Sequence, residues 1–162
     1  MGKQPVDEDA GGCVGDLLDQ AVDLTARFLS DRADLSASAA FAMNRVCREG
    51  PMRLTALASK EGVSQPSMTQ LIQRLERQGL IARLADPDDG RACLIGITTR
   101  GQELLDDRRR LRRERLRALM ATLTAEEQGV LRQTAQVAFP VLRRLAENAD
   151  CSSDTAGQRV VQ

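Results

Sequence analysis

Residues 53–100 read RLTALASKEGVSQPSMTQLIQRLERQGLIARLADPDDGRACLIGITTR, and this stretch decides the fold. The pattern predicts a short helix over 54–60, a turn at Glu61-Gly62 and a second, amphipathic helix that begins after Ser64. Two strands follow, LIARLA and ACLIGI, joined by the turn-rich segment DPDDG. This order of helix, turn, helix and hairpin is typical of proteins that place a helix in the DNA major groove.

The second of these helices carries the candidate contact residues. Ser64 is the expected N-cap, and Pro66 is tolerated in the first turn, where its missing N–H is not needed. Apolar residues fall at i, i+3, i+4 and i+7 from Met68 to Leu75 and predict the buried face. The remaining positions are poor in acid and rich in groups that bond phosphates and base edges, although such a pattern also suits an ordinary solvated helix. The DNA-binding candidates on this helix are Ser64, Gln65, Pro66, Ser67, Thr69, Gln70, Gln73, Arg74 and Arg77.

The hairpin tip is the second candidate contact. Asp86-Pro87 suits the start of a type I turn. Asp88 or Asp89 is expected to pair with Arg91 and to support its guanidinium for insertion into a narrow minor groove. The alternative is a solvated hairpin tip whose arginine has no role. The position directly after the amphipathic helix favours the DNA contact.

Long helices flank this region on both sides. Ser36 is the expected N-cap of the second helix, and the segment Thr124–Glu127 reads as a capping box that opens the last one. Pro140 should kink that last helix. Its apolar residues are too many for one narrow stripe, so they predict a surface that another chain covers. The run RRRLRRERLR (108–117) suits a solvated face better than a nucleic-acid patch. The expected flanking helices span 15–31, 37–49, 98–122 and 125–148.

Composition removes several classes of function. The chain has no His, Trp or Tyr, which excludes triads with an imidazole base and zinc sites that need His. The cysteines, Cys13, Cys47, Cys93 and Cys151, form no CxxC pair, and no glycine-rich phosphate loop is present. We therefore expect no enzyme activity, no metal and no cofactor. The polar start of the chain and the lack of a long apolar run predict a cytoplasmic protein with reduced thiols and no membrane partner.

The net charge of zero conceals an uneven distribution. Residues 1–36 contain eight acidic and three basic residues, whereas residues 51–120 contain fourteen basic and nine acidic ones. Phosphate would repel the first region and attract the second, so the overall neutrality is compatible with DNA binding.

Residues 54–105, LTALASKEGVSQPSMTQLIQRLERQGLIARLADPDDGRACLIGITTRGQELL, resemble the winged helix-turn-helix of the multiple antibiotic resistance regulator (MarR) family of bacterial repressors. The resemblance implies a mainly α fold with a small β-hairpin wing, flanked by long dimerisation helices. It implies an obligate homodimer in which the first, fifth and sixth helices of both chains interleave. It further implies binding of a pseudo-palindromic operator in double-stranded DNA, often ended by a small ligand or by oxidation.

The periodicity of the sequence and the resemblance together divide the chain into five parts. These are a disordered N-terminal tail (1–12), N-terminal helices for dimerisation and support (13–50), the winged helix-turn-helix (51–100), C-terminal dimerisation helices (101–149) and a disordered tail (150–162). The leading interpretation is a dimeric repressor of its own or neighbouring genes. The alternatives are a thiol-based redox-sensing repressor and a winged-helix interaction module that does not bind DNA.

The signal that the protein senses is less constrained. Family members that sense hydroperoxides hold an N-terminal Cys with tyrosines, and Cys13 has no Tyr to partner it. Cys13 also lies in an acidic stretch that disfavours the thiolate, and Cys47 and Cys93 are expected to be buried packing residues. We therefore expect a small apolar or amphipathic effector between the dimerisation helices and the winged region. Its expected lining is Phe28, Phe41, Met43 and Arg45.

Overall fold

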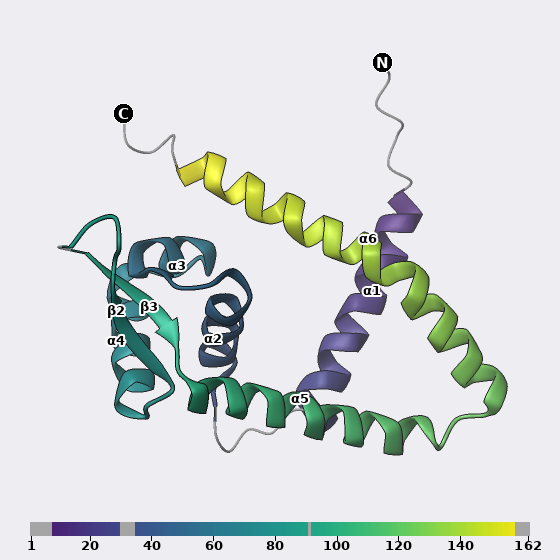
Figure 1. Ribbon diagram of the computed structural model, residues 1–162. Helices are drawn as coiled ribbons and strands as arrows, with labels where there is room; N and C mark the ends of the chain where they lie inside the picture. The colour runs from purple at the N-terminus through teal and green to yellow at the C-terminus, as the bar shows by residue number, and fades with distance from the viewer. Residues whose placement is uncertain (1–7, 30–34, 91, 158–162) are drawn as a thin grey trace.

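The computed structural model describes residues 8–29, 35–90 and 92–157, with side chains described over 11–29, 35–90 and 92–149. Figure 1 shows a small group of helices around a twisted sheet, from which α5 leads to a pair of long terminal helices. The elements in chain order are α1 (Glu8–Leu24), the π-helical turn η1 (Thr25–Leu29), α2 (Ala37–Glu49), β1 (Met52–Arg53), α3 (Leu54–Lys60), α4 (Gln65–Arg77), β2 (Ile81–Ala85), β3 (Cys93–Ile97), α5 (Thr99–Met120) and α6 (Ala125–Gly157).

The helices nearest the predicted motif begin and end where their caps predicted. The Ser36 hydroxyl accepts a hydrogen bond from the Ala39 N–H at 3.3 Å, and α2 ends at Gly50, whose φ of 87° suits glycine. Helix α3 spans the predicted residues 54–60. These local signals locate the helix ends because each cap bonds backbone N–H or C=O groups that have no partner within the helix.

The sheet has three strands rather than the two of a simple hairpin. Its strand order is β1-β3-β2, and all pairs are antiparallel. The added strand pairs Met52 with Ile95 and Arg53 with Leu94. A strand of two residues is too short to show alternation in the sequence, which is why the prediction contained only the hairpin.

Both terminal helices extend beyond their predicted limits. Helix α1 begins at Glu8, so the prediction of disorder over 1–12 is wrong for residues 8–12. Acidic residues at its start suit the helix dipole despite the glycines at 11 and 12. Helix α6 continues to Gly157, past the predicted end near Asn148, so a disordered tail from 150 is wrong up to 157. Extending a formed helix needs no new nucleation, so it proceeds without an apolar pattern.

The main hydrophobic core lies within residues 35–105, which are called the winged region from here on. It is built from α2, α3, α4, the sheet and the first turns of α5, and its side chains are almost fully buried. Burial of this kind contributes about 25 cal/mol per Å² of apolar surface and holds the elements together. The buried cluster comprises Leu35, Ala39, Ala42, Met43, Val46, Leu57, Ala58, Met68, Ile72, Leu75, Leu80, Ile81, Ile95 and Leu105.

The start of α5 is fixed to the turn that follows α4. The Thr98 hydroxyl donates to the Gly79 carbonyl at 2.7 Å and accepts from the Gly101 N–H at 3.0 Å. The Thr98 N–H donates to the Leu80 carbonyl at 3.1 Å. Helix and turn approach so closely that a Cβ on Gly101 would lie 2.1 Å from the Leu80 carbonyl oxygen. Only glycine fits this contact.

The terminal helices leave their apolar residues exposed. An apolar groove of about 530 Å³ runs between α1 and α6, which cross one another in Figure 1. Its lining includes Val14, Leu17 and Leu18 from α1 and Val137 and Val141 from α6. Val137 and Val141 are 68% and 61% exposed. A single chain thus leaves this surface uncovered within the residues described.

Candidate nucleic-acid interface

Helix α4 presents its polar side to solvent because its apolar side is buried. Met68, Ile72 and Leu75 are buried, and Leu71 is half-buried. The helix is capped by Ser64, whose hydroxyl accepts from the Ser67 N–H at 3.4 Å. The predicted helix, its cap and its buried face are confirmed. Most of the candidate contact residues are exposed: Ser64, Gln65, Pro66, Ser67, Gln70, Gln73, Arg74 and Arg77.

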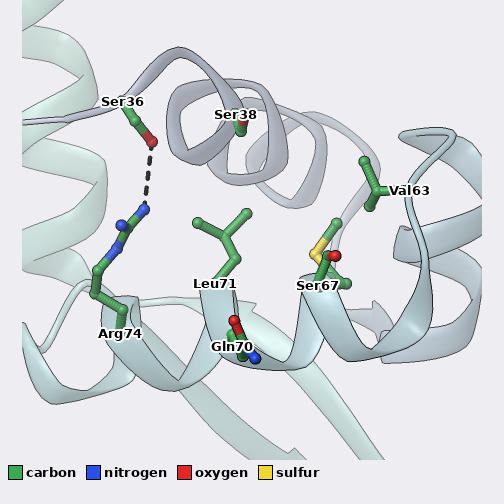
Figure 2. A pocket seen from close by; sticks show the side chains of 8 residues that line it. Ser36, Ser38, Val63, Ser67, Gln70, Leu71 and Arg74 are labelled. Carbon is green, nitrogen blue, oxygen red and sulfur yellow. Dashed lines mark hydrogen bonds between the residues drawn. The ribbon is translucent and has the colours of Figure 1, made fainter.

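Hydrogen bonds already orient several of these side chains. The Thr69 hydroxyl donates to the Gln65 carbonyl at 2.8 Å, and Thr69 is half-buried. Arg77 donates from Nε to the Gln73 carbonyl at 3.2 Å. Arg74 turns toward α2 and donates from Nη2 to the Ser36 hydroxyl at 3.3 Å, as Figure 2 shows. Arg74 and Arg77 therefore point in different directions from the same helix.

The charge of this exposed face is positive. The carboxylate on α4, that of Glu76, pairs with Arg83 of β2, whose Nε lies 3.3 Å from its Oε2. Glu76 is half-buried and flanks Gln73 at the edge of the exposed face, where Arg83 offsets its charge. A surface with amide, hydroxyl and guanidinium groups, whose one carboxylate is paired, matches the acceptors of a DNA groove and its phosphates.

The start of the hairpin tip is anchored by an ion pair that sequence reasoning missed. Arg53 of β1 donates to Oδ2 of Asp86 from Nη2 at 2.8 Å and from Nε at 3.1 Å. Asp86 is 7% exposed, and its Oδ1 accepts from the Asp88 N–H at 3.0 Å. The Arg53 guanidinium, followed by the Asp88 N–H, holds the pKa of Asp86 below its usual range, and Asp86 in turn raises the pKa of Arg53.

Asp88 and Asp89 were predicted to support Arg91 at the hairpin tip. Asp89 lies 3.4 Å from Nη2 of the same Arg53, and Asp88 is exposed. Arg91, the predicted minor-groove residue, lies outside the described residues. The sequence signal for Asp86 was its place before Pro87 in a turn. Its partner could be found only from the pairing of β1 with β3, which brings together residues 33 positions apart.

The four residues predicted to line an effector pocket have different surroundings. Met43 is fully buried in the core, so an effector cannot reach it in this structure. Arg45 donates to Glu49 of its own helix at 2.9 Å and to Glu61 at 2.5 Å. Because Glu61 lies in the turn between α3 and α4, this second bond links α2 to that turn. Phe28 and Phe41 are 56% and 65% exposed. Met43 lies on another face of α2 than Phe41 and Arg45, because helical residues two apart do not face each other.

The cysteines also depart in part from expectation. Cys93 is exposed, so the prediction that it is a buried packing residue is wrong. Cys47 is half-buried and donates from its thiol to Oε1 of Gln102 on α5 at 3.0 Å. Cys13 is exposed on α1. The side chain of Cys151 lies outside the described side chains.

The arginine run on α5 is partly neutralised by neighbouring acids. Arg109 pairs with Asp106 at 2.9 Å and donates to Asn44 of α2 at 2.9 Å. Arg110 pairs with Asp107 at 2.9 Å. Such exposed pairs contribute little to stability, but they lower the charge that this helix offers to DNA. In the described part of the chain, no helix combines the length and the apolar character needed to cross a membrane.

The sequence has clear relatives among regulators. Residues 35–93 match the profile of the MarR family. An HTH-type transcriptional regulator of Mycobacterium tuberculosis is 37% identical over 111 residues, which cover 68% of this chain and 78% of the relative. A similar regulator of Mycobacterium leprae is 34% identical over 116 residues, covering 72% and 81%. The homoprotocatechuate degradative operon repressor of Escherichia coli is 34% identical over 84 residues, covering 51% and 57%.

Solved structures show the same fold. A MarR family protein from Bacillus stearothermophilus superposes with a TM-score of 0.64 at 21% identity, covering 89% of this chain and 98% of that one. Wild-type MarR from Escherichia coli in its apo form superposes with a TM-score of 0.61 at 22% identity, covering 76% and 95%. Together with the matched profile and the regulators of similar sequence, the fold identifies this chain as a member of the MarR family, a DNA-binding transcriptional regulator built on a winged helix-turn-helix.

Proposed function

We propose that this chain is a homodimeric repressor of its own or neighbouring genes that binds a pseudo-palindromic operator and leaves it when a small effector binds. The exposed face of α4 carries this proposal. It offers amide, hydroxyl and guanidinium groups, with its one carboxylate paired, beside a hairpin whose tip is anchored at Asp86. In this proposal α4 is the recognition helix in the major groove, and the hairpin is the wing that places Arg91 in the minor groove.

Different residues would serve different purposes at the operator. Gln70 and Gln73 lie on the most exposed side of the recognition helix and would read base edges, as glutamine pairs with adenine through two hydrogen bonds. Arg77 and Arg91 would add charge and groove contacts. Ser64, Gln65, Ser67 and Thr69 would hold the start of the helix against the backbone, with Pro66 beside them.

The uncovered groove between α1 and α6 supports the homodimer. A second copy supplies the same apolar helices, so one surface would cover the other in a two-fold arrangement. Exposed apolar patches of this kind mark interaction sites. A dimer would also present two recognition helices to successive major grooves, about 34 Å apart, and so favour an operator of two half-sites.

Repression and release by an effector are the finer part of the proposal. One relative is named as the repressor of a degradative operon, and repression follows physically when a dimer occupies the promoter that polymerase needs. An effector that changes the separation of the two recognition helices would remove one of them from its half-site. The exposed thiols of Cys13 and Cys93 favour a second candidate, release by oxidation.

The decisive experiment is a gel shift with the promoters of the chain's own gene and its neighbours. We expect a retarded complex that contains two chains, with an affinity that falls steeply with salt. A variant with Cys13, Cys47, Cys93 and Cys151 replaced by serine or alanine should respond to peroxide no differently from the wild type. If peroxide releases only the wild type, oxidation is the signal. If no duplex is bound, the winged-helix interaction module is the better proposal.

A further inference from the structure

A pocket of about 300 Å³ lies between the start of α2 and the recognition helix. Figure 2 shows α2 above it and α4 below it, with Ser36 and Arg74 bridging one end. Ser38 contributes to its lining from the first turn of α2, and Ser67 does so from the first turn of α4. Leu71, half-buried, lies between these polar groups. The lining contains one cation and several hydroxyls but no carboxylate, so the pocket suits an anion.

Arg74 is directed across this pocket and away from the face that would read bases. Its Nη2 lies 3.3 Å from the Ser36 hydroxyl, which also caps α2. Within the described part of the chain, this is the one hydrogen bond of the guanidinium, and Arg74 is exposed. A guanidinium has five N–H donors, so most of them stay available to an incoming ligand.

The place of the pocket on α4 indicates which anion it receives. At 100° per residue, Ser67 and Arg74 lie on the flank of the helix, next to the face of Gln70, Gln73 and Arg77. When a helix lies in the major groove, its outer face meets the base edges and its flanks meet the sugar-phosphate walls. The start of α2 is on this flank, and its first-turn amides and dipole favour a negative charge.

We propose that the pocket seats one phosphate of the DNA backbone, bound by Arg74 and by the hydroxyl of Ser38. This rests on the proposed function, since it requires α4 to enter the major groove. It assigns a phosphate contact to Arg74 in place of a base contact. It also makes the start of α2 a second DNA-binding element of the protein. Each dimer has two such seats, one for each half-site.

The test uses full-length protein and a short mixed-sequence duplex, because a phosphate contact does not depend on sequence. Ser38→Asp places a carboxylate in the pocket, and Ser38→Asn is its uncharged match. We expect Ser38→Asp to weaken duplex binding about tenfold or more and Ser38→Asn to change it little. An acid in the first turn suits the α2 dipole, so the Asp variant should melt at or above the wild-type temperature. Its weaker binding then cannot come from unfolding.

The salt dependence of a second variant measures how many phosphates the protein contacts. Arg74→Gln should reduce the slope of log K against log salt by about 0.9 for each chain, or about 1.8 for the dimer. It should weaken binding to all duplexes alike and leave the preference for the operator unchanged. Arg113→Gln, which removes an exposed arginine of α5 outside the pocket, is the charge-matched control and should leave the slope unchanged.

The outcomes separate this proposal from the proposed function. If the wild type binds duplex DNA but Ser38→Asp binds as well as Ser38→Asn, the phosphate seat is wrong and the repressor proposal stands. The seat is also wrong if Arg74→Gln changes operator preference and not the salt slope. A free small anion is tested with inorganic phosphate at constant ionic strength. If phosphate raises the melting temperature of the wild type but not of Ser38→Asp, while both bind duplex DNA equally, the pocket serves a free anion and our proposal fails.

Discussion

The winged region and the terminal helices of this chain use their apolar residues in opposite ways. In the winged region, Met43, Ile72 and Ile95 are fully buried and belong to one continuous cluster. In α1 and α6, Val22 and Val137 are 66% and 68% exposed. The first region buries its apolar residues within one chain. The second leaves the apolar faces of α1 and α6 exposed. The apolar residues of the first region thus hold the fold together, whereas those of α1 and α6 are open to contact with another chain.

The largest effect should come from charging the uncovered groove. Val137→Asp combined with Val141→Asp should weaken the dimer on the order of a thousandfold, because two unpaired carboxylates would have to be buried at several kcal/mol each. Sedimentation velocity over a concentration series measures this. The control is Gln136→Asp on an exposed position of α6 outside the groove lining. A tight dimer in the doubly charged variant would show that another surface joins the chains.

One substitution made in each region should have opposite signs. Gly101→Ala forces a Cβ against the Leu80 carbonyl oxygen and should lower the free energy of unfolding by about 1–3 kcal/mol. Gly129→Ala in α6 meets nothing within 4 Å and should raise helix stability by about 0.5–1 kcal/mol. Thermal unfolding at one protein concentration compares them. Equal effects would mean that the contact at the start of α5 is not rigid.

Base reading should be separable from assembly. Gln70→Ala or Gln73→Ala should lower the discrimination between operator and other sequences by about 1–3 kcal/mol, because each removes the amide that pairs with a base edge. Sedimentation of these variants should match the wild type, since both residues lie far from the groove between α1 and α6. Gln136→Ala removes an exposed amide from α6 and should alter neither property. Competition binding with operator and scrambled duplexes gives the discrimination, and unchanged values would remove these glutamines from the reading face.

The smallest effect concerns acidification of the winged region. Because the pKa of Asp86 is lowered in the folded protein, its carboxylate stabilises the fold at neutral pH. That stabilisation is lost as the pH falls below about 4, the usual pKa of aspartate, and through the lower folded value. Asp86→Asn should therefore be less stable than the wild type at pH 7, and the difference should shrink in acid. A constant difference across this range would contradict the role of the Arg53 pair.

Features that depend on neighbouring residues were predictable from the sequence. The caps at Ser36 and Ser64 and the apolar spacing from Met68 to Leu75 determine α2 and α4, because each signal acts within one or two turns. Such signals also determine which side of α4 is exposed. The family resemblance followed from these same elements and is confirmed by the matched profile.

Features that depend on distant parts of the chain were not predictable. The pair of Arg53 and Asp86 requires the register of β1 on β3, which no local pattern encodes. The burial of Met43 depends on how α2 rotates against its neighbours. The pocket beside Arg74 requires the start of α2 to lie next to α4, and the sequence separates Ser36 from Arg74 by 38 positions.

The close contact between Gly101 and the Leu80 carbonyl has a consequence for how motion spreads through the molecule. It joins the first turn of α5 directly to the turn that follows α4, so we expect a tilt of α5 to carry α4 with it. Helix α5 has 22 residues and is therefore about 33 Å long. A tilt of only about 6° at one end of such a rod displaces its other end by about 3.4 Å, the rise of one base pair. In the proposed function, a change of this size at the far end of α5 would shift the recognition helix by about one base pair along the operator.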